Sequence, residues 1–157
     1  MVFESKELLI NMQSTPDEES QEFFDFWKTE GIKCKNGITI DGVFISGFLY
    51  FHLNFFKCQI DVEKNGRIER KFTNPYLRDN EWIIDSYIRQ GEQERKGVCI
   101  LGSRRLAKSV FEASYIVHRS TFFKGTQNVI AGLNEPDIKI IADLVRNLKA
   151  IKIELSF

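Results

Sequence analysis

The chain has 157 residues, and its 22 basic and 22 acidic side chains cancel, so no overall positive field points to nucleic acid or a membrane surface. A hydrophobic content of 43%, with 14 phenylalanines, is typical of one globular domain and excludes a disordered chain. No apolar run is long enough to span a bilayer, and the N-terminus lacks the features of a secretory signal. The three cysteines are odd in number and far apart, which favours neither disulfides nor a zinc site. We therefore expect a cytoplasmic protein with no membrane partner.

The first predicted element is a helix over residues 16–30. Thr15 is a suitable N-cap, Pro16 fits the first helical position and Glu18 would complete a capping box. Gly31 suits the left-handed position after the last turn. Aromatic side chains at spacings of three and four would form the buried face of this helix, namely Phe23, Phe24 and Trp27.

Turn dipeptides then predict short strands and hairpins. Apolar and polar residues alternate between positions 32 and 43, and this stretch contains the hairpin dipeptides Asn36-Gly37 and Asp41-Gly42. The aromatic stretch 45–56 fits either a short buried helix capped by Ser46 or a strand. A second hairpin is expected about Asn65-Gly66, with strands over 57–63 and 67–72.

After Asn74-Pro75 the pattern changes to alternating helices and strands. A parallel sheet flanked by helices is the fold that such an order predicts. The expected elements are a helix over 79–90, a strand over 98–101, a loop over 102–107, a helix over 108–122, a strand over 128–131, a helix over 134–149 and a last strand over 151–155. We thus predict an α/β fold in which residues 1–74 form a helix-and-hairpin extension and residues 75–157 form the first part of a nucleotide-binding domain.

One stretch in residues 75–157 matches a known phosphate-binding motif. Residues 102–109 read Gly-Ser-Arg-Arg-Leu-Ala-Lys-Ser and match the phosphate-binding loop G-x-x-x-x-G-K-[ST], except that Ala107 replaces the second glycine. In such a loop the backbone N–H groups at a helix start surround phosphate oxygens, the lysine reaches the terminal phosphates and the hydroxyl binds Mg²⁺. The competing interpretation is an ordinary strand-to-helix turn in which Lys108 and Ser109 have no ligand.

The loop resembles the Walker A motif of the large terminase subunit of tailed bacteriophages, which packages DNA into procapsids. Two other segments agree with this resemblance. Residues 77–81 (Leu-Arg-Asp-Asn-Glu) are similar to the start of the adenine-recognition segment of some large terminases. The aromatic block over 42–54 is similar to a block upstream of the ATPase core in terminases of large-genome phages. The resemblance covers residues 20–148 and implies a P-loop NTPase core.

The resemblance also implies ligands and roles for individual residues. The ligands would be ATP and Mg²⁺, with Lys108 on the β- and γ-phosphates, Ser109 on the metal ion and Arg104 as an internal arginine finger. Arg105 would face nucleotide, a neighbouring subunit or solvent. The nucleotide-binding residues would be Gly102, Ser103, Arg104, Arg105, Leu106, Ala107, Lys108 and Ser109, together with Arg78 and Glu81 near the base. Glu81 stands where the family has glutamine, and a carboxylate serves the adenine amino group but not the ring acceptors.

The chain departs from the family in one important respect. No apolar run ending in Asp-Glu follows the loop, and the acidic cluster of the nuclease domain is missing. We therefore expect the N-terminal portion of a large terminase, as a split-gene product, a decayed copy or an engineered piece, with little ATPase activity alone. In the full motor its partners would be viral double-stranded DNA, the portal protein and the small terminase subunit, in the host cytoplasm. An incomplete sheet would leave an open edge through which homo-oligomers form.

Two alternatives remain, a non-catalytic phage interaction module that keeps part of the ATPase fold and a helicase-like P-loop ATPase. The aromatic block disfavours the latter. The remaining residues of chemical interest have simpler structural interpretations. We expect His52 and His118 to have structural roles and Cys99 to be a small core residue.

Overall fold

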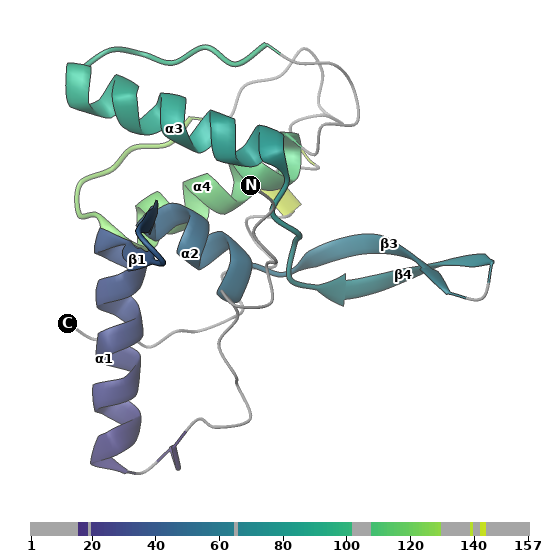
Figure 1. Ribbon diagram of the computed structural model, residues 1–157, viewed down its shortest axis with the longest axis horizontal. Coiled ribbons are helices and arrows are strands. Elements are labelled where there is room, and N and C mark those ends of the chain that lie inside the picture. Colours follow the sequence, from purple (N-terminus) through teal and green to yellow (C-terminus); the bar gives the residue numbers. More distant parts are fainter. Residues whose placement is uncertain are drawn as a thin grey trace.

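The computed structural model describes residues 16–18, 20–64, 66–101, 108–129, 139 and 142–143. Within these ranges the chain combines helices with small antiparallel sheets, which confirms the mixed helix-and-strand class in this coarse form. The elements in chain order are α1 (Gln21–Asn36), β1 (Ile38–Ile40), β2 (Val43–Ile45), α2 (Gly47–Asn54), β3 (Cys58–Lys64), β4 (Arg67–Thr73), α3 (Asp79–Glu94) and α4 (Lys108–Phe122). Figure 1 shows α2 in the middle of the helices and the β3–β4 hairpin projecting away from them.

Helix α2 is the centre of the core. All of its residues are buried, and it contacts α1, α3 and α4. Of the two alternatives left open for residues 45–56, the helix capped by Ser46 is the one observed, because the Ser46 hydroxyl accepts a hydrogen bond from the backbone N–H of Leu49 at 3.1 Å. The Phe48 ring lies edge-on to the rings of Phe111 and Tyr115, with centroid distances of 4.8 and 5.1 Å. A short helix that is buried on every side is thus stabilised by packing, since its own length is too small to sustain it.

The first residue of α2 must be glycine because α1 approaches it so closely. A Cβ atom on Gly47 would collide with the backbone carbonyl of Cys34 in the last turn of α1. His118 of α4 reaches the same carbonyl, with its Nε2 at 2.7 Å from the oxygen. Since a carbonyl only accepts, Nε2 carries the proton and donates it. The end of α1, the start of α2 and the middle of α4 therefore meet at one backbone oxygen.

A buried carboxylate connects α2 with α3. Asp85 is 2% exposed, and its Oδ1 accepts a hydrogen bond from the Ser46 hydroxyl at 2.7 Å. Its Oδ2 accepts from Nε of Arg89 at 2.9 Å. Burial raises the pKa of Asp85, while the hydrogen bonds from Ser46 and Arg89 act to lower it. The same serine hydroxyl thus caps one helix and binds the carboxylate of another.

The predicted boundaries of the first helix were wrong at both ends. Helix α1 begins at Gln21, because the Ser20 hydroxyl accepts from the backbone N–H of Phe23 at 3.1 Å. It continues through the buried Gly31 to Asn36, so the expected strand residues 32–34 are helical, and Gly37 with φ of 83° follows its last turn. Thr15 lies outside the described residues. Phe24, predicted to be buried, is 61% exposed.

Of the three turn dipeptides chosen as hairpin signals, two lie between paired antiparallel strands, whereas Asn36-Gly37 was wrong, because Asn36 is the last residue of α1 and Gly37 caps this helix. Asp41 and Gly42 have φ of 48° and 79° and connect the antiparallel strands β1 and β2, with Ile40 opposite Val43. Strands β3 and β4 pair from Cys58 opposite Thr73 to Lys64 opposite Arg67, which matches the predicted second hairpin to within one residue at each end. Neither pair of strands is joined to another strand within the described ranges.

The predicted parallel sheet is not seen in the described part of the second half. Residues 98–101 and 128–129 form no strand, and Leu101 is 93% exposed. Cys99 is exposed, so the prediction of a core cysteine was wrong. Apolar composition alone does not make a strand, because a strand requires a neighbour for its backbone groups. Helices α3 and α4 are confirmed. The structure does not describe residues 130–131 or the expected last strand over 151–155. Of the expected helix over 134–149 it describes only residues 139 and 142–143.

Replacing Ser46 with alanine tests the link between α2 and α3. The Ser46→Ala variant loses a helix cap and leaves a buried carboxylate oxygen without its donor, so we expect a loss of about 2–4 kcal/mol in unfolding free energy. Ser86→Ala is the matched control, because Ser86 is exposed on α3 and bonds only the Ile83 carbonyl of its own helix. Urea unfolding monitored by tryptophan fluorescence measures both. Equal stability of the two variants would contradict the structural role of Ser46.

Candidate functional site

The predicted phosphate-binding loop borders the described structure. Residues 102–107 lie outside the described residues. Lys108 is the first residue of α4, and Ser109 follows it with an exposed side chain. The first turn of α4 contains no acidic residue, whereas α1 and α3 carry Glu22, Asp79 and Glu81 in their first turns. The positive end of the α4 dipole is therefore not offset by a carboxylate in its own first turn.

The two residues predicted to lie near the adenine base of a nucleotide are at the start of α3. Arg78 is the exposed N-cap residue of this helix. The Glu81 carboxylate accepts a hydrogen bond from the backbone N–H of Arg78 at 3.0 Å and is 2% exposed. Burial raises the pKa of Glu81, and the hydrogen bond and charge of Arg78 act to lower it. This carboxylate thus stabilises the start of its own helix.

The starts of α3 and α4 adjoin the same buried histidine of α2. His52 is 0% exposed, and its ring centroid lies 5.5 Å from that of Phe111 near the start of α4. Burial, together with a smaller effect of the nearby charge of Arg78, lowers the pKa of His52 to about 3. Figure 1 shows both helices starting at the end of the body from which the hairpin leaves. Lys108, Ser109 and Arg78 are therefore brought to the same end of the molecule.

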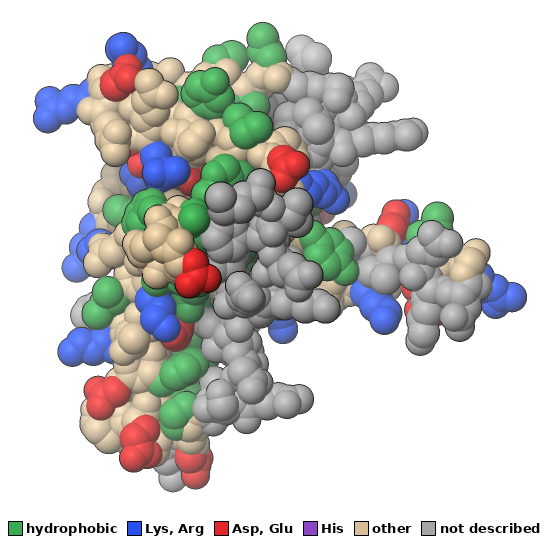
Figure 2. Space-filling model, viewed as in Figure 1, with side chains coloured by type: hydrophobic (Ala, Val, Ile, Leu, Met, Phe, Trp, Pro, Cys, Tyr) green, Lys and Arg blue, Asp and Glu red, His purple; other side chains and the backbone are tan. Residues whose placement is uncertain are grey.

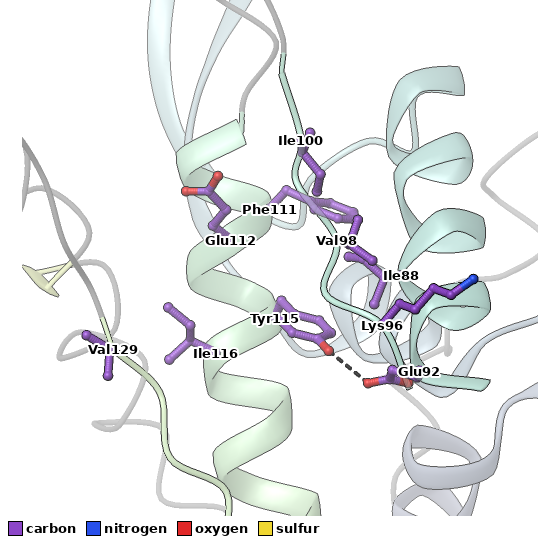
Figure 3. Close-up of a pocket in the computed structure, with 10 residues that line it drawn as sticks. All are labelled: Ile88, Glu92, Lys96, Val98, Ile100, Phe111, Glu112, Tyr115, Ile116 and Val129. Atoms are coloured by element: carbon purple, nitrogen blue, oxygen red, sulfur yellow. Dashed lines mark hydrogen bonds between the residues drawn. The ribbon is translucent and has the colours of Figure 1, made fainter. Parts of the chain in front are cut away.

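A pocket of about 410 Å³ lies beside α4 and is separate from these residues. It is enclosed by α3, α4 and the extended segment 96–100 (Figure 3). Most of its wall is apolar, and none of Arg78, Glu81 and Ser109 lines it. The lining residues are Ile88, Glu92, Lys96, Val98, Ile100, Phe111, Glu112, Tyr115, Ile116 and Val129.

Glu92 organises the polar end of this pocket. Its Oε1 accepts a hydrogen bond from the Tyr115 hydroxyl at 2.9 Å and lies 3.1 Å from Nη1 of Arg119. Burial raises the pKa of Tyr115 to about 12, and the bond to Glu92 raises it too. Figure 3 shows this bond between Tyr115 of α4 and Glu92 of α3. The tyrosine remains protonated at neutral pH and acts as a hydrogen-bond donor.

The histidines and cysteines of the described residues lie in the core or apart from one another and form no metal-binding cluster. Among the described residues, no group of three or more His, Cys, Asp or Glu is placed to hold a metal ion. Burial raises the pKa of the thiols of Cys34 and Cys58, which keeps them protonated and unreactive. His52 and His118 are buried among aromatic rings, as expected of structural residues.

Sequence reasoning did not find the buried polar contacts that order the helices. Glu30 of α1 is 3% exposed and accepts hydrogen bonds from Nζ of Lys33 at 2.6 Å and from the Tyr50 hydroxyl of α2. The only local signal was the spacing of Glu30 and Lys33 on one helix face. Asp85 and His118 carried no local signal of their partners, which lie 39 and 84 residues away in the chain.

Comparisons of the chain with models of protein families, with curated proteins and with solved structures found no match. Among the described helices, none is sufficiently long and apolar to cross a membrane.

The burial of His118 makes stability depend on pH, and its hydrogen bond to the Cys34 carbonyl acts against this effect. Burial lowers the pKa of His118 to about 4, from an ordinary value near 6.5. Between about pH 6.5 and pH 4, His118 is protonated in the unfolded chain but stays neutral in the folded protein. The free energy of unfolding therefore decreases by roughly 3 kcal/mol as pH falls through this range. The His118→Gln variant keeps an amide donor but cannot titrate.

We therefore expect wild type to lose its advantage over His118→Gln as pH falls through this window. Urea unfolding of both proteins between pH 7 and pH 4 measures the difference, and the groups common to the two proteins cancel. If the difference in unfolding free energy between the two proteins were constant with pH, His118 would not be the buried, neutral group described above.

Proposed function

We propose that the chain is the ATP-binding N-terminal portion of a phage large terminase subunit, with a P-loop at residues 102–109. The observation that carries this proposal is that α4 covers Lys108–Phe122, so the lysine of the motif lies in the helix that follows the loop. A phosphate-binding loop requires a helix that starts at this position, so that backbone N–H groups and the lysine converge on the phosphates. The motif also requires a strand before the loop, and residues 96–101 at that position form no strand with the described residues, so this part of the motif remains a proposal.

Local charge supports an anionic ligand at this end of the molecule. Lys108 begins a helix whose first turn has no acid, and Arg78 is exposed at the start of α3. Arg104 and Arg105 add two further cations in the adjoining sequence. Together with the helix dipole, these cations favour a triphosphate.

The roles proposed for the residues follow from their chemistry. Lys108 would pair with the β- and γ-phosphates, and Arg104 would stabilise the charge that develops on the transferred phosphoryl group. Ser109 is exposed in the first turn of α4, where its hydroxyl is available to Mg²⁺. When bound, Mg²⁺ would neutralise phosphate charge and align the terminal phosphate. In the whole motor, ATP hydrolysis would drive viral DNA into the procapsid through the portal protein, with the small subunit assisting, in the host cytoplasm.

A second candidate is a non-catalytic interaction module that keeps part of an ATPase fold. The observation that favours it is the segment 98–101, which has no strand partner among the described residues. Such a module would retain the loop and α4 as scaffold and bind another phage protein.

Removing the motif lysine tests the leading proposal. We expect the wild-type chain to bind Mg-ATP weakly and the Lys108→Ala variant to lose binding by a factor of 100 or more, roughly 3 kcal/mol, because a charge-assisted contact to phosphate disappears. Isothermal titration calorimetry with Mg-ATP and Mg-ADP measures this loss. Lys124→Ala is the matched control, since it removes an exposed lysine outside the helices. No binding by wild type, or equal binding by both variants, would overturn the proposal and favour the interaction module.

A second test concerns turnover. We expect the purified chain to hydrolyse ATP negligibly even where it binds the nucleotide, because the sequence contains no apolar run ending in the acids that support Mg²⁺ and activate water. Phosphate release at saturating Mg-ATP measures this. Robust turnover that disappears in Arg104→Ala would show that a catalytic carboxylate is present and was missed.

A further inference from the structure

The β3–β4 hairpin presents a free sheet edge on a projecting arm. Figure 1 shows both strands extending away from the helices, and Figure 2 shows apolar and charged side chains on the arm. From Arg67 to Phe72 every residue of β4 is exposed, with Ile68 and Phe72 at 75% and 59%. In the described structure β4 pairs only with β3, so one row of its backbone groups lacks a sheet partner. A two-stranded hairpin is marginally stable alone, and free edges are templates for further pairing.

We propose that two copies of this chain associate through β4, antiparallel and centred on Arg70, to form a four-stranded sheet. A symmetric antiparallel pair of identical strands has its two-fold axis perpendicular to the sheet, so it must be centred on one residue. Centring on Arg70 places Glu69 opposite the partner's Lys71 and Ile68 opposite the partner's Phe72. Symmetry repeats each of these pairs, giving two opposite-charge pairs and two apolar pairs across the interface.

The neighbouring registers lack this complementarity. Centring on Glu69 places Ile68 opposite Arg70, Arg67 opposite Lys71 and the two glutamates opposite each other. Centring on Lys71 brings the two lysines together and places Arg70 opposite Phe72. Like charges opposite each other are destabilising, and so are charged residues opposite apolar ones where a matched pair is available. Centring on Ile68 keeps an opposite-charge pair, Arg67 with the partner's Glu69, but it gives one apolar pair in place of two and leaves Phe72 without a partner on β4. The register centred on Arg70 therefore forms the most apolar pairs together with its opposite-charge pairs.

The central arginine has a partner within its own hairpin. Asp61 of β3 lies opposite Arg70, and its Oδ1 is 3.3 Å from Nε of Arg70. Each arginine at the two-fold axis is therefore accompanied by a carboxylate, which offsets the repulsion between the two copies. The β3 edge is a poorer candidate, because centring it on Asp61 places Gln59 opposite Glu63 and creates no opposite-charge pair.

Charge reversal at Glu69 and Lys71 tests this interface cleanly. Within the hairpin these residues lie opposite Val62 and Ile60, so neither reversal breaks a charge pair across the strands. Sedimentation equilibrium of the full chain should show a dimer. Glu69→Lys or Lys71→Glu should each weaken it by about tenfold or more, because each creates two like-charged pairs. The double variant Glu69→Lys/Lys71→Glu should restore dimerisation, since the opposite-charge pairs are then re-formed with reversed sign.

A cross-link tests the register itself. In a Cys99→Ser background, which removes the exposed native thiol, Arg70→Cys should form a disulfide between copies under mild oxidation. Arg67→Cys is the control, because in this register the two copies of residue 67 are about 20 Å apart. A wild-type chain that is monomeric at all concentrations, a dimer insensitive to both reversals, a double variant that fails to re-associate, or equal cross-linking at 70 and 67 would each overturn the proposal.

Discussion

The helical body depends on one backbone oxygen, the carbonyl of Cys34. It lies in the last turn of α1, where carbonyl groups lack partners within the helix. His118 of α4 donates a hydrogen bond to it, and Gly47 at the start of α2 packs directly against it. One atom thus fixes the mutual approach of three helices. The close packing at Gly47 leaves no room for a side chain, so the position of α2 relative to α1 is set by sterics.

Polar contacts inside an aromatic core determine which helix faces which. The hydrogen bonds of Asp85 to Ser46 and of Tyr50 to Glu30 each join α2 to a different neighbour. A buried carboxylate without these donors would be costly, so other arrangements of the helices are disfavoured. The apolar rings supply most of the driving force, and they tolerate many packings. For the proposed function, this rigidity matters because it holds the starts of α3 and α4 at one end of the body.

The sequence predicted the elements whose signals are local and failed where the decision depends on distant contacts. Ser46 and the dipeptides Asp41-Gly42 and Asn65-Gly66 act on their immediate neighbours, and they predicted α2 and both hairpins. Gly31 had the right composition for a helix end, but α1 continues past it because the core buries this glycine and Gly37 provides the left-handed residue. The strand expected at 98–101 requires a partner strand, and strand pairing cannot be read from a single run of apolar residues. The helix predicted after the motif is confirmed as α4, whereas the burial of Glu81 against its own helix was not foreseen.

The central position of α2 also affects the order in which the chain can fold during synthesis. The protein leaves the ribosome from its N-terminus, and α2 is complete long before α4 has been made. Phe48 and Phe51 are covered by Phe111 and Phe122, which are 63 and 71 residues further along the chain. At typical elongation rates, this interval leaves the aromatic face of α2 without its final cover for roughly 3 to 14 s. During that time the nascent chain presents an apolar surface of the kind that chaperones bind.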